Sequence, residues 1–176
     1  MIIMRRRLGV VVALGGLLGI LGGVVTASPA LARGPQWTFL PAQAFTLDPS
    51  FCGFPVGVAF PTDKEYAKLL KTTDGSAIVL VNGALTTSFT NLATGKTITE
   101  NNSGPDQTTI FPDGSITFTI SGNAVTILTP ADAARFGFPT VAVTAGPLTG
   151  SIAPDGTLTS LSLHGHVLEN VCAALS

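Results

Sequence analysis

Charged residues are scarce in this chain of 176 residues, where nine basic and ten acidic side chains make up 11% of the sequence. The basic side chains form no cluster larger than the lysines between positions 64 and 71. Nucleic acids and anionic membranes bind proteins through concentrated positive charge, so neither is an expected partner.

Motifs that mark enzymes are also missing. The chain has two cysteines and two histidines, and it contains no CxxC, HExxH or GxSxG motif and no phosphate-binding loop. His164 and His166 would share a strand face with nearby serines, but the sequence places no acidic partner beside them, so we expect a polar outward face there rather than a metal or Ser/His pair. Asp113 and Asp155 each lie in a Pro-Asp-Gly turn, which accounts for an aspartate without catalysis. The sequence therefore identifies no catalytic residue, cofactor or metal ligand, and it favours a protein that is not an enzyme.

The N-terminus has the parts of a secretory signal peptide. Three arginines at positions 5–7 precede an uncharged run at 8–25, and a small-x-small site ends at Ala32. A membrane anchor is the alternative, because the run could just span a bilayer. We predict cleavage after Ala32, export by the Sec or the Tat pathway, and no stable membrane anchor in the mature, secreted protein.

One domain is expected after the leader is removed. Loss of residues 1–32 leaves 144 of the 176 residues, with six basic and ten acidic side chains. That length suits a single domain, which we place at 51–176. The preceding arm at 33–50 carries three aromatic residues between prolines, and it either lies over the domain or remains mobile.

The two cysteines, Cys52 and Cys172, are predicted to form one disulfide, since an even number of cysteines in an oxidising compartment is most simply paired. The bond would tie the two ends of the domain together.

Turn signals recur about every eight to twelve residues and separate short runs rich in Val, Ile, Thr and Phe, a spacing typical of an all-β protein. One short helix is expected at 129–137, where Thr129 can cap the N-terminus and Gly137 can end it. The run at 62–71 has features of both helix and strand, and the neighbouring strand signals favour a strand.

The stretch "FPDGSITFTISGN" at 111–123 predicts a turn followed by a strand with one apolar face. A similar stretch, "PDGTLTSLSLHGH", follows at 154–166, but its alternation slips by one residue, which predicts a β-bulge near Thr159 and Ser160. Five apolar side chains of the two strands are candidates to line the interior: Ile116, Phe118, Ile120, Leu161 and Leu163.

We expect these strands to form a small antiparallel up-and-down β-barrel of about eight strands. The first and last strands of such a barrel are neighbours, which would bring Cys52 and Cys172 within bonding distance. A β-sandwich is the alternative, although its disulfide usually joins strands from the middle of the chain.

Several segments resemble a family of small exported actinobacterial proteins of uncharacterised function. They are "FCGFPVGVAFP", "TNLATGKTITENNSGP" at 90–105, the Pro-Asp-Gly turns, and the ending "GHVLENVCAALS". The resemblance covers about residues 51–176 and implies secretion, a β-rich domain and a disulfide between the terminal strands. It implies no activity.

Three functions remain open. The favoured one is a secreted, non-enzymatic interaction or envelope-associated protein, whose partner would be extracellular. The first alternative is a carrier that holds a small apolar ligand in the barrel interior. The apolar strand faces that contain Phe118 and Leu161 suggest it. The second is a cyclase or isomerase on a barrel scaffold, which would require a buried polar cluster.

Overall fold

The structure is a computed structural model that describes residues 35–176. The predicted signal peptide at 1–32 lies outside the described residues. No helix within the described range is long and apolar enough to cross a membrane.

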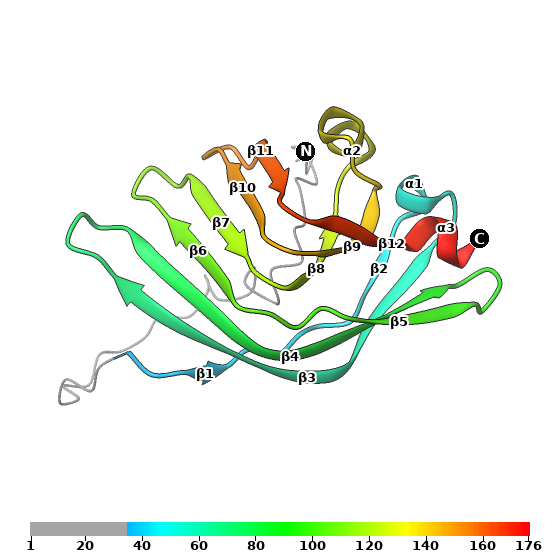
Figure 1. Ribbon diagram of the computed structural model, residues 1–176, viewed down its shortest axis with the longest axis horizontal. Helices are drawn as coiled ribbons and strands as arrows, with labels where there is room; N and C mark the ends of the chain where they lie inside the picture. Colours follow the sequence, from blue (N-terminus) through cyan, green and yellow to red (C-terminus); the bar gives the residue numbers. More distant parts are fainter. Residues whose placement is uncertain (1–34) are drawn as a thin grey trace, which may run out of the picture.

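Short helices and antiparallel strands make up the described chain (Figure 1). In chain order the elements are β1 (Thr38–Phe39), β2 (Phe45–Leu47), α1 (Pro49–Cys52), β3 (Val56–Lys71), β4 (Ala77–Asn91), β5 (Thr97–Asn101), β6 (Asp106–Ile110), β7 (Ile116–Ile120), β8 (Asn123–Ile127), α2 (Pro130–Phe136), β9 (Val141–Ala145), β10 (Leu148–Ile152), β11 (Leu158–Leu163), β12 (His166–Asn170) and α3 (Val171–Leu175).

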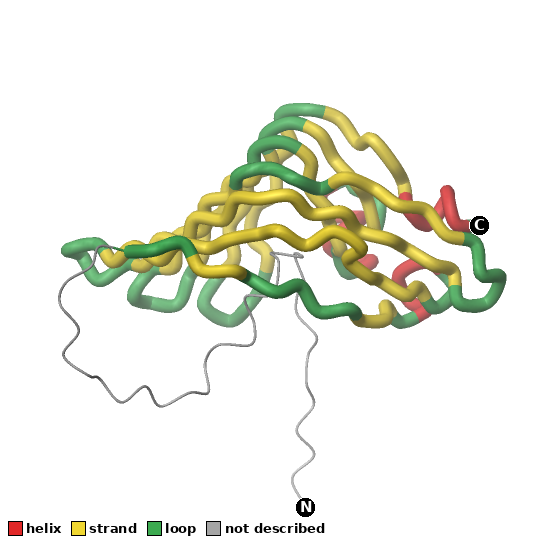
Figure 2. Tube along the Cα trace, turned by 90° about the horizontal axis from the view of Figure 1, so that it is seen from below, coloured by secondary structure: helices red, strands yellow, loops and turns green. Residues whose placement is uncertain are grey.

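Most strands belong to one nine-stranded sheet with the order β1-β3-β4-β6-β7-β10-β11, to which β2 is added on β3 and β5 on β4. A second sheet has the order β12-β9-β8. Successive strands of the large sheet are joined by hairpins whose turns contain Asp-Gly, at Asp74, Asp113 and Asp155. The three Asp-Gly turns lie toward one end of the molecule, and the β4–β5 turn lies with α1 and α3 toward the other (Figures 1 and 2).

The second sheet continues strands of the large sheet after a bend. Strands β7 and β8 are separated by two residues, as are β9 and β10, and β11 and β12, and a glycine stands in each interruption: Gly122, Gly146 and Gly165. At Gly165 a Cβ atom would lie 1.9 Å from the carbonyl oxygen of Ala145, so no other residue fits this backbone approach. The bends turn three long segments so that each contributes to both sheets.

The predicted closed barrel is not found in the described chain. The antiparallel, sequential strand order agrees with the prediction, but β1 and β11 stand at opposite edges of the large sheet and no pairing joins them. The described strands number twelve rather than about eight, because the bends divide long segments. After the bends, β8 and β9 pack against β3 and β4 instead of extending the sheet, around a core that contains Phe89, Val125 and Val143.

The disulfide is present, and it joins the two short helices at the chain ends rather than two terminal strands. The Cα atoms of Cys52 in α1 and Cys172 in α3 are 5.1 Å apart, and the two residues are 120 positions apart in the sequence. The hydroxyl of Thr140 donates to the carbonyl of Phe51 at 2.6 Å beside this bond. The disulfide links α1 to α3 at the end of the molecule where both helices lie.

Part of the N-terminal arm belongs to the large sheet. Strands β1 and β2 both pair with β3, and Leu40 and Leu47 are buried. The arm therefore supplies core residues, which its proline content does not indicate.

Several local expectations are confirmed. The run at 62–71 lies within strand β3, and helix α2 begins after Thr129, whose hydroxyl accepts from the amide of Asp132, and ends at Gly137. In the β10–β11 ladder Ser151 pairs with Ser160 but Ile152 pairs with Leu158, so Thr159 is the extra residue of the expected bulge.

Candidate functional site

The five candidate interior residues lie on two strands that flank β10. Phe118 is 2% exposed and Ile120 is 8% exposed, and both belong to a core cluster with Leu148 and Leu158. Leu161 and Leu163 are partly buried against the same cluster, and Ile116 is also partly buried. These side chains pack against one another and against α2, so their faces contribute to a filled core at this point.

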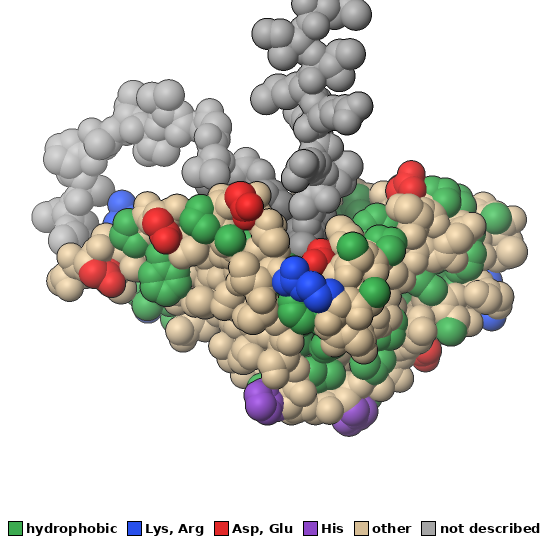
Figure 3. Space-filling model, turned by 90° about the horizontal axis from the view of Figure 1, so that it is seen from above, with side chains coloured by type: hydrophobic (Ala, Val, Ile, Leu, Met, Phe, Trp, Pro, Cys, Tyr) green, Lys and Arg blue, Asp and Glu red, His purple; other side chains and the backbone are tan. Residues whose placement is uncertain are grey.

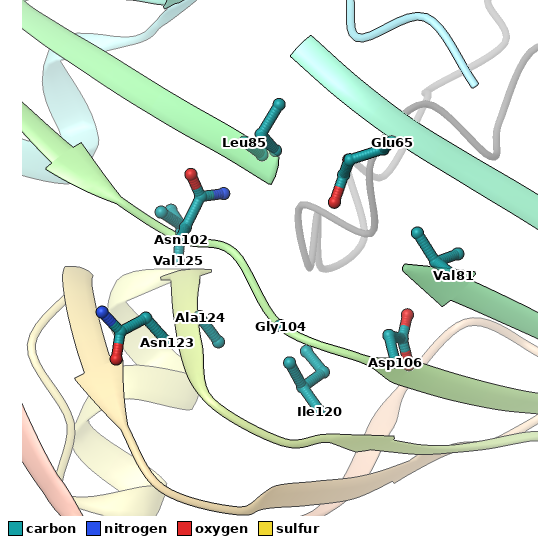
Figure 4. A pocket seen from close by; sticks show the side chains of 10 residues that line it. All are labelled: Glu65, Val81, Leu85, Asn102, Gly104, Asp106, Ile120, Asn123, Ala124 and Val125. Atoms are coloured by element: carbon teal, nitrogen blue, oxygen red, sulfur yellow. The ribbon is translucent and has the colours of Figure 1, made fainter. Parts of the chain in front are cut away.

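A small cavity lies at the inner corner where the two sheets diverge. Its volume is about 30 Å³, enough for one or two water molecules. A carrier of a drug-sized ligand needs several hundred cubic ångströms, which this corner does not provide. The residues around it come from β3, β4, β6, β7 and β8 and from the chain just before β6: Glu65, Val81, Leu85, Asn102, Gly104, Asp106, Ile120, Asn123, Ala124 and Val125 (Figure 4).

Glu65 is the buried charged residue of this corner cavity. It lies on β3 opposite Gly83 of β4, is 6% exposed, and directs its carboxyl group into the cavity (Figure 4). Its Oε2 atom is buried and has no hydrogen-bond partner among residues 35–176. Burial, with repulsion from Asp63 and Asp106, raises the pKa of Glu65 to about 7. The carboxyl group is therefore poised between its charged and neutral forms near neutral pH.

Asp106 supplies a second carboxyl group to the corner cavity. It opens strand β6 and pairs with Val81 on one side and with Ile120 on the other. Burial raises its pKa to about 7, although a hydrogen bond from Thr108 at 3.5 Å acts in the opposite direction. Two carboxyl groups thus come from strands far apart in the sequence.

A larger groove lies on the outer face of the large sheet. Leu80, Gln107 and Thr119 are directly paired neighbours on β4, β6 and β7, so their side chains share the face opposite the buried Val79 and Phe118. The outer groove encloses about 390 Å³ and is lined by Trp37, Leu80, Val81, Asn82, Pro105, Asp106, Gln107, Thr119 and Ser121.

Trp37 lines this groove, and two further aromatic side chains are exposed next to it, Tyr66 opposite the lining residue Asn82 and Phe39 opposite Tyr66. Trp37, Phe39 and Tyr66 are each 46 to 48% exposed. The rings of Phe39 and Tyr66 meet edge to face with centroids 5.8 Å apart. Because β1 pairs with β3 through Phe39 and Tyr66, the arm brings its aromatic residues onto the large sheet.

The two other sets of sequence candidates do not form a site. His164 and His166 are exposed, as are Ser160 and Ser162, and no group of three or more His, Cys, Asp or Glu side chains within residues 35–176 comes together as a metal site. Asp113 accepts from the amide of Ser115, and Asp155 accepts from the amide of Thr157, both at 2.9 Å. The turn geometry explains both aspartates, as expected.

The sequence interpretation missed Glu65, Asp106 and the outer groove. Glu65 alternates with Ala67 and Leu69 along β3. Its position on this partly apolar face was the one feature of the sequence that could have indicated its burial. Asp106 begins the polar strand "DQTTI", which has no apolar face of its own. That this segment is a strand, with Asp106 on its inner side, follows only from its pairing with β4 and β7.

On the face seen in Figure 3, charged side chains are scattered and form no single patch. The chain matches no protein-family model, no curated protein and no solved structure.

Proposed function

We propose that the mature chain is an exported, non-enzymatic binding protein that holds a neutral saccharide in the outer groove. The observation that carries this proposal is the exposure of Trp37, Phe39 and Tyr66 beside a groove of about 390 Å³. Large aromatic side chains are normally well buried, so three exposed ones close together favour a binding surface.

The chemistry of the groove suits a sugar ring. A sugar presents an apolar face of C–H groups and an edge of hydroxyl groups, and an aromatic ring offers a matching apolar face. The amides of Asn82 and Gln107 and the hydroxyl of Thr119 can each donate and accept hydrogen bonds. Among residues 35–176, Asp106 is the one ionisable residue that lines the groove and no basic residue does so, which disfavours an anionic ligand.

Export is supported by two features. The leader has the composition of a signal peptide, and the disulfide between Cys52 and Cys172 suits an oxidising compartment. A saccharide of a cell envelope or extracellular matrix is a ligand that such a protein would meet.

Fluorescence titration tests the proposal directly, because Trp37 is the chain's single tryptophan. Mature protein is titrated with neutral oligosaccharides of about four to eight units, and a saturable change in emission is expected. Calorimetry on Trp37→Ala and Tyr66→Ala should show at least about a tenfold loss of affinity, which corresponds to about 1.4 kcal/mol.

Leu92→Ala is the matched control, because Leu92 is 53% exposed but neither lines the groove nor pairs with a residue that lines it. Equal binding by the Trp37 and Leu92 variants, or no response to any neutral saccharide, would contradict the proposal. Binding of a protein or an acidic polysaccharide instead would assign the groove to a different ligand.

A further inference from the structure

The buried carboxyl group of Glu65 lacks the partner that such groups normally have. A carboxylate that is 6% exposed is costly unless it is hydrogen-bonded or paired with positive charge. Its Oε2 atom has neither a donor nor an ion pair within the described chain. The atom borders the corner cavity, so a group placed in that cavity would reach it (Figure 4).

The charge around the cavity is of one sign. Glu65 and Asp106 are its ionisable lining residues, and no lysine, arginine or histidine of the described chain lines it. Asp63 adds a third carboxyl group nearby, which acts on Glu65 through repulsion. An occupant that balances these side chains must therefore be positively charged.

The size of the cavity and its oxygen atoms restrict which cation fits. All the polar side chains around it end in carboxyl or amide groups, which are hard oxygen donors. A volume of about 30 Å³ cannot hold the several waters that Mg²⁺ usually retains. Ca²⁺ exchanges its water for carboxylate oxygens and accepts both oxygens of one carboxyl group, so Glu65, Asp106 and one water can supply five ligands. The amide oxygen of Asn102 is not among them, because it accepts from the hydroxyl of Thr87 at 2.9 Å.

The corner cavity and the outer groove approach each other at one pair of residues. Val81 and Asp106 line both the corner cavity and the outer groove. Val81 and Asp106 are the final pair of the β4–β6 ladder, and residues 102–105, which precede β6, do not belong to that ladder. An ion entering by the groove would meet Asp106 first.

We propose that Glu65 and Asp106 form a Ca²⁺ site in the corner cavity between the two sheets. The bound ion neutralises both carboxylates and links β3 to β6 beside the bend at Gly122. This site does not depend on the saccharide proposal, because stability and metal affinity are measured without any sugar.

Chelator-treated mature protein is the material for the test. In about 10 mM CaCl₂ at pH 7.5 the midpoint of thermal unfolding should rise by roughly 3 to 10 °C, as expected for extracellular Ca²⁺ sites of moderate affinity. MgCl₂ at the same concentration should raise it by less than half as much. Calorimetry should give one Ca²⁺ per chain.

Glu65→Gln and Asp106→Asn should each reduce Ca²⁺ affinity at least about tenfold. Glu100→Gln makes the same chemical change on β5 outside the cavity lining and should bind as the wild type does. If a cavity variant does not fold, the wild-type calorimetry still decides. Absence of Ca²⁺ binding, equal effects of Ca²⁺ and Mg²⁺, or full binding by Glu65→Gln would overturn the site and leave a protonated carboxyl pair.

Discussion

The ring of Phe118 occupies the space in which a side chain at Gly150 would stand. The two residues are directly opposite each other in the β7–β10 ladder. A Cβ atom at Gly150 would lie 2.4 Å from the ring's ζ carbon and 2.9 Å from the carbonyl oxygen of Ser160. The aromatic ring therefore fills the core above β10 because its cross-strand neighbour has no side chain.

Gly150→Ala is expected to destabilise the protein by about 1 to 3 kcal/mol, since the added methyl group overpacks a filled core. The free energy of unfolding by urea measures the loss. Thr149→Ala is the control, because it removes side-chain atoms on the opposite face of the same strand. A Gly150 variant as stable as the wild type would show that the ring moves aside without cost.

Phe118→Ala should leave a cavity and cost about 3 to 5 kcal/mol, because the side chain is 2% exposed. In that background Gly150→Ala should cost less than it does alone, since the ring it meets is gone. Strictly additive losses in the double variant would contradict direct contact. Thr119→Ala, exposed on the other face of β7, should change the free energy of unfolding by less than about 0.5 kcal/mol.

Loss of the disulfide should lower stability substantially. For a closed loop of 120 residues the chain-entropy model gives roughly 5 kcal/mol, and real bonds often give less. Cys52→Ser and Cys172→Ser should lose similar amounts, and the double variant should be no worse than either. Additive losses would mean that the two cysteines act separately.

Stability should fall as the pH rises from about 4 to about 7 when metal is absent. The pKa values of Glu65 and Asp106 are raised to about 7, whereas unfolded carboxyl groups titrate near pH 4. Within this window the folded state binds more protons than the unfolded state, so the free energy of unfolding decreases by at most about 1.4 kcal/mol per pH unit for each group. Above about pH 7 this contribution is constant.

Urea denaturation in chelator between about pH 4.5 and pH 8 measures this slope. Glu65→Gln removes one of the groups and should flatten it. Asp113 accepts hydrogen bonds from Ser115, which hold its pKa below the usual value, so its stabilisation is lost only below about pH 4 and should remain in the variant. A wild-type stability that increases from pH 5 to pH 7 would contradict the assignment.

Local chemistry explains which elements could be predicted from the sequence. The turn at Asp113 and Gly114 depends on an aspartate that accepts from the backbone two residues later and on a glycine with a φ angle of 86°, and both requirements are visible in the residues themselves. The cap at Thr129 and the bulge at Thr159 are equally local. Alternation within β7 was enough to orient Phe118, because every residue of that face is apolar.

The remaining features depend on contacts between distant segments. The bend at Gly165 has no local signature, because it follows from the approach of Ala145, twenty positions earlier in the chain. The burial of Glu65 depends on how β3, β4 and β6 meet. From the sequence alone, a charged side chain at this position is expected to be exposed. The barrel was favoured because it explained the disulfide, yet two short helices bring Cys52 and Cys172 together without closing the sheet.

The glycine bends also restrict how the strands can misalign. Segments β7–β8, β9–β10 and β11–β12 each run through both sheets. A shift of one residue in the pairing register of one sheet therefore shifts the register of the other sheet as well. A slip in the last segment would bring His164 or His166 to the position where a Cβ atom lies 1.9 Å from the carbonyl oxygen of Ala145. Neither side chain can be accommodated there. The requirement for glycine at this one position thus excludes shifted registers in two sheets at once.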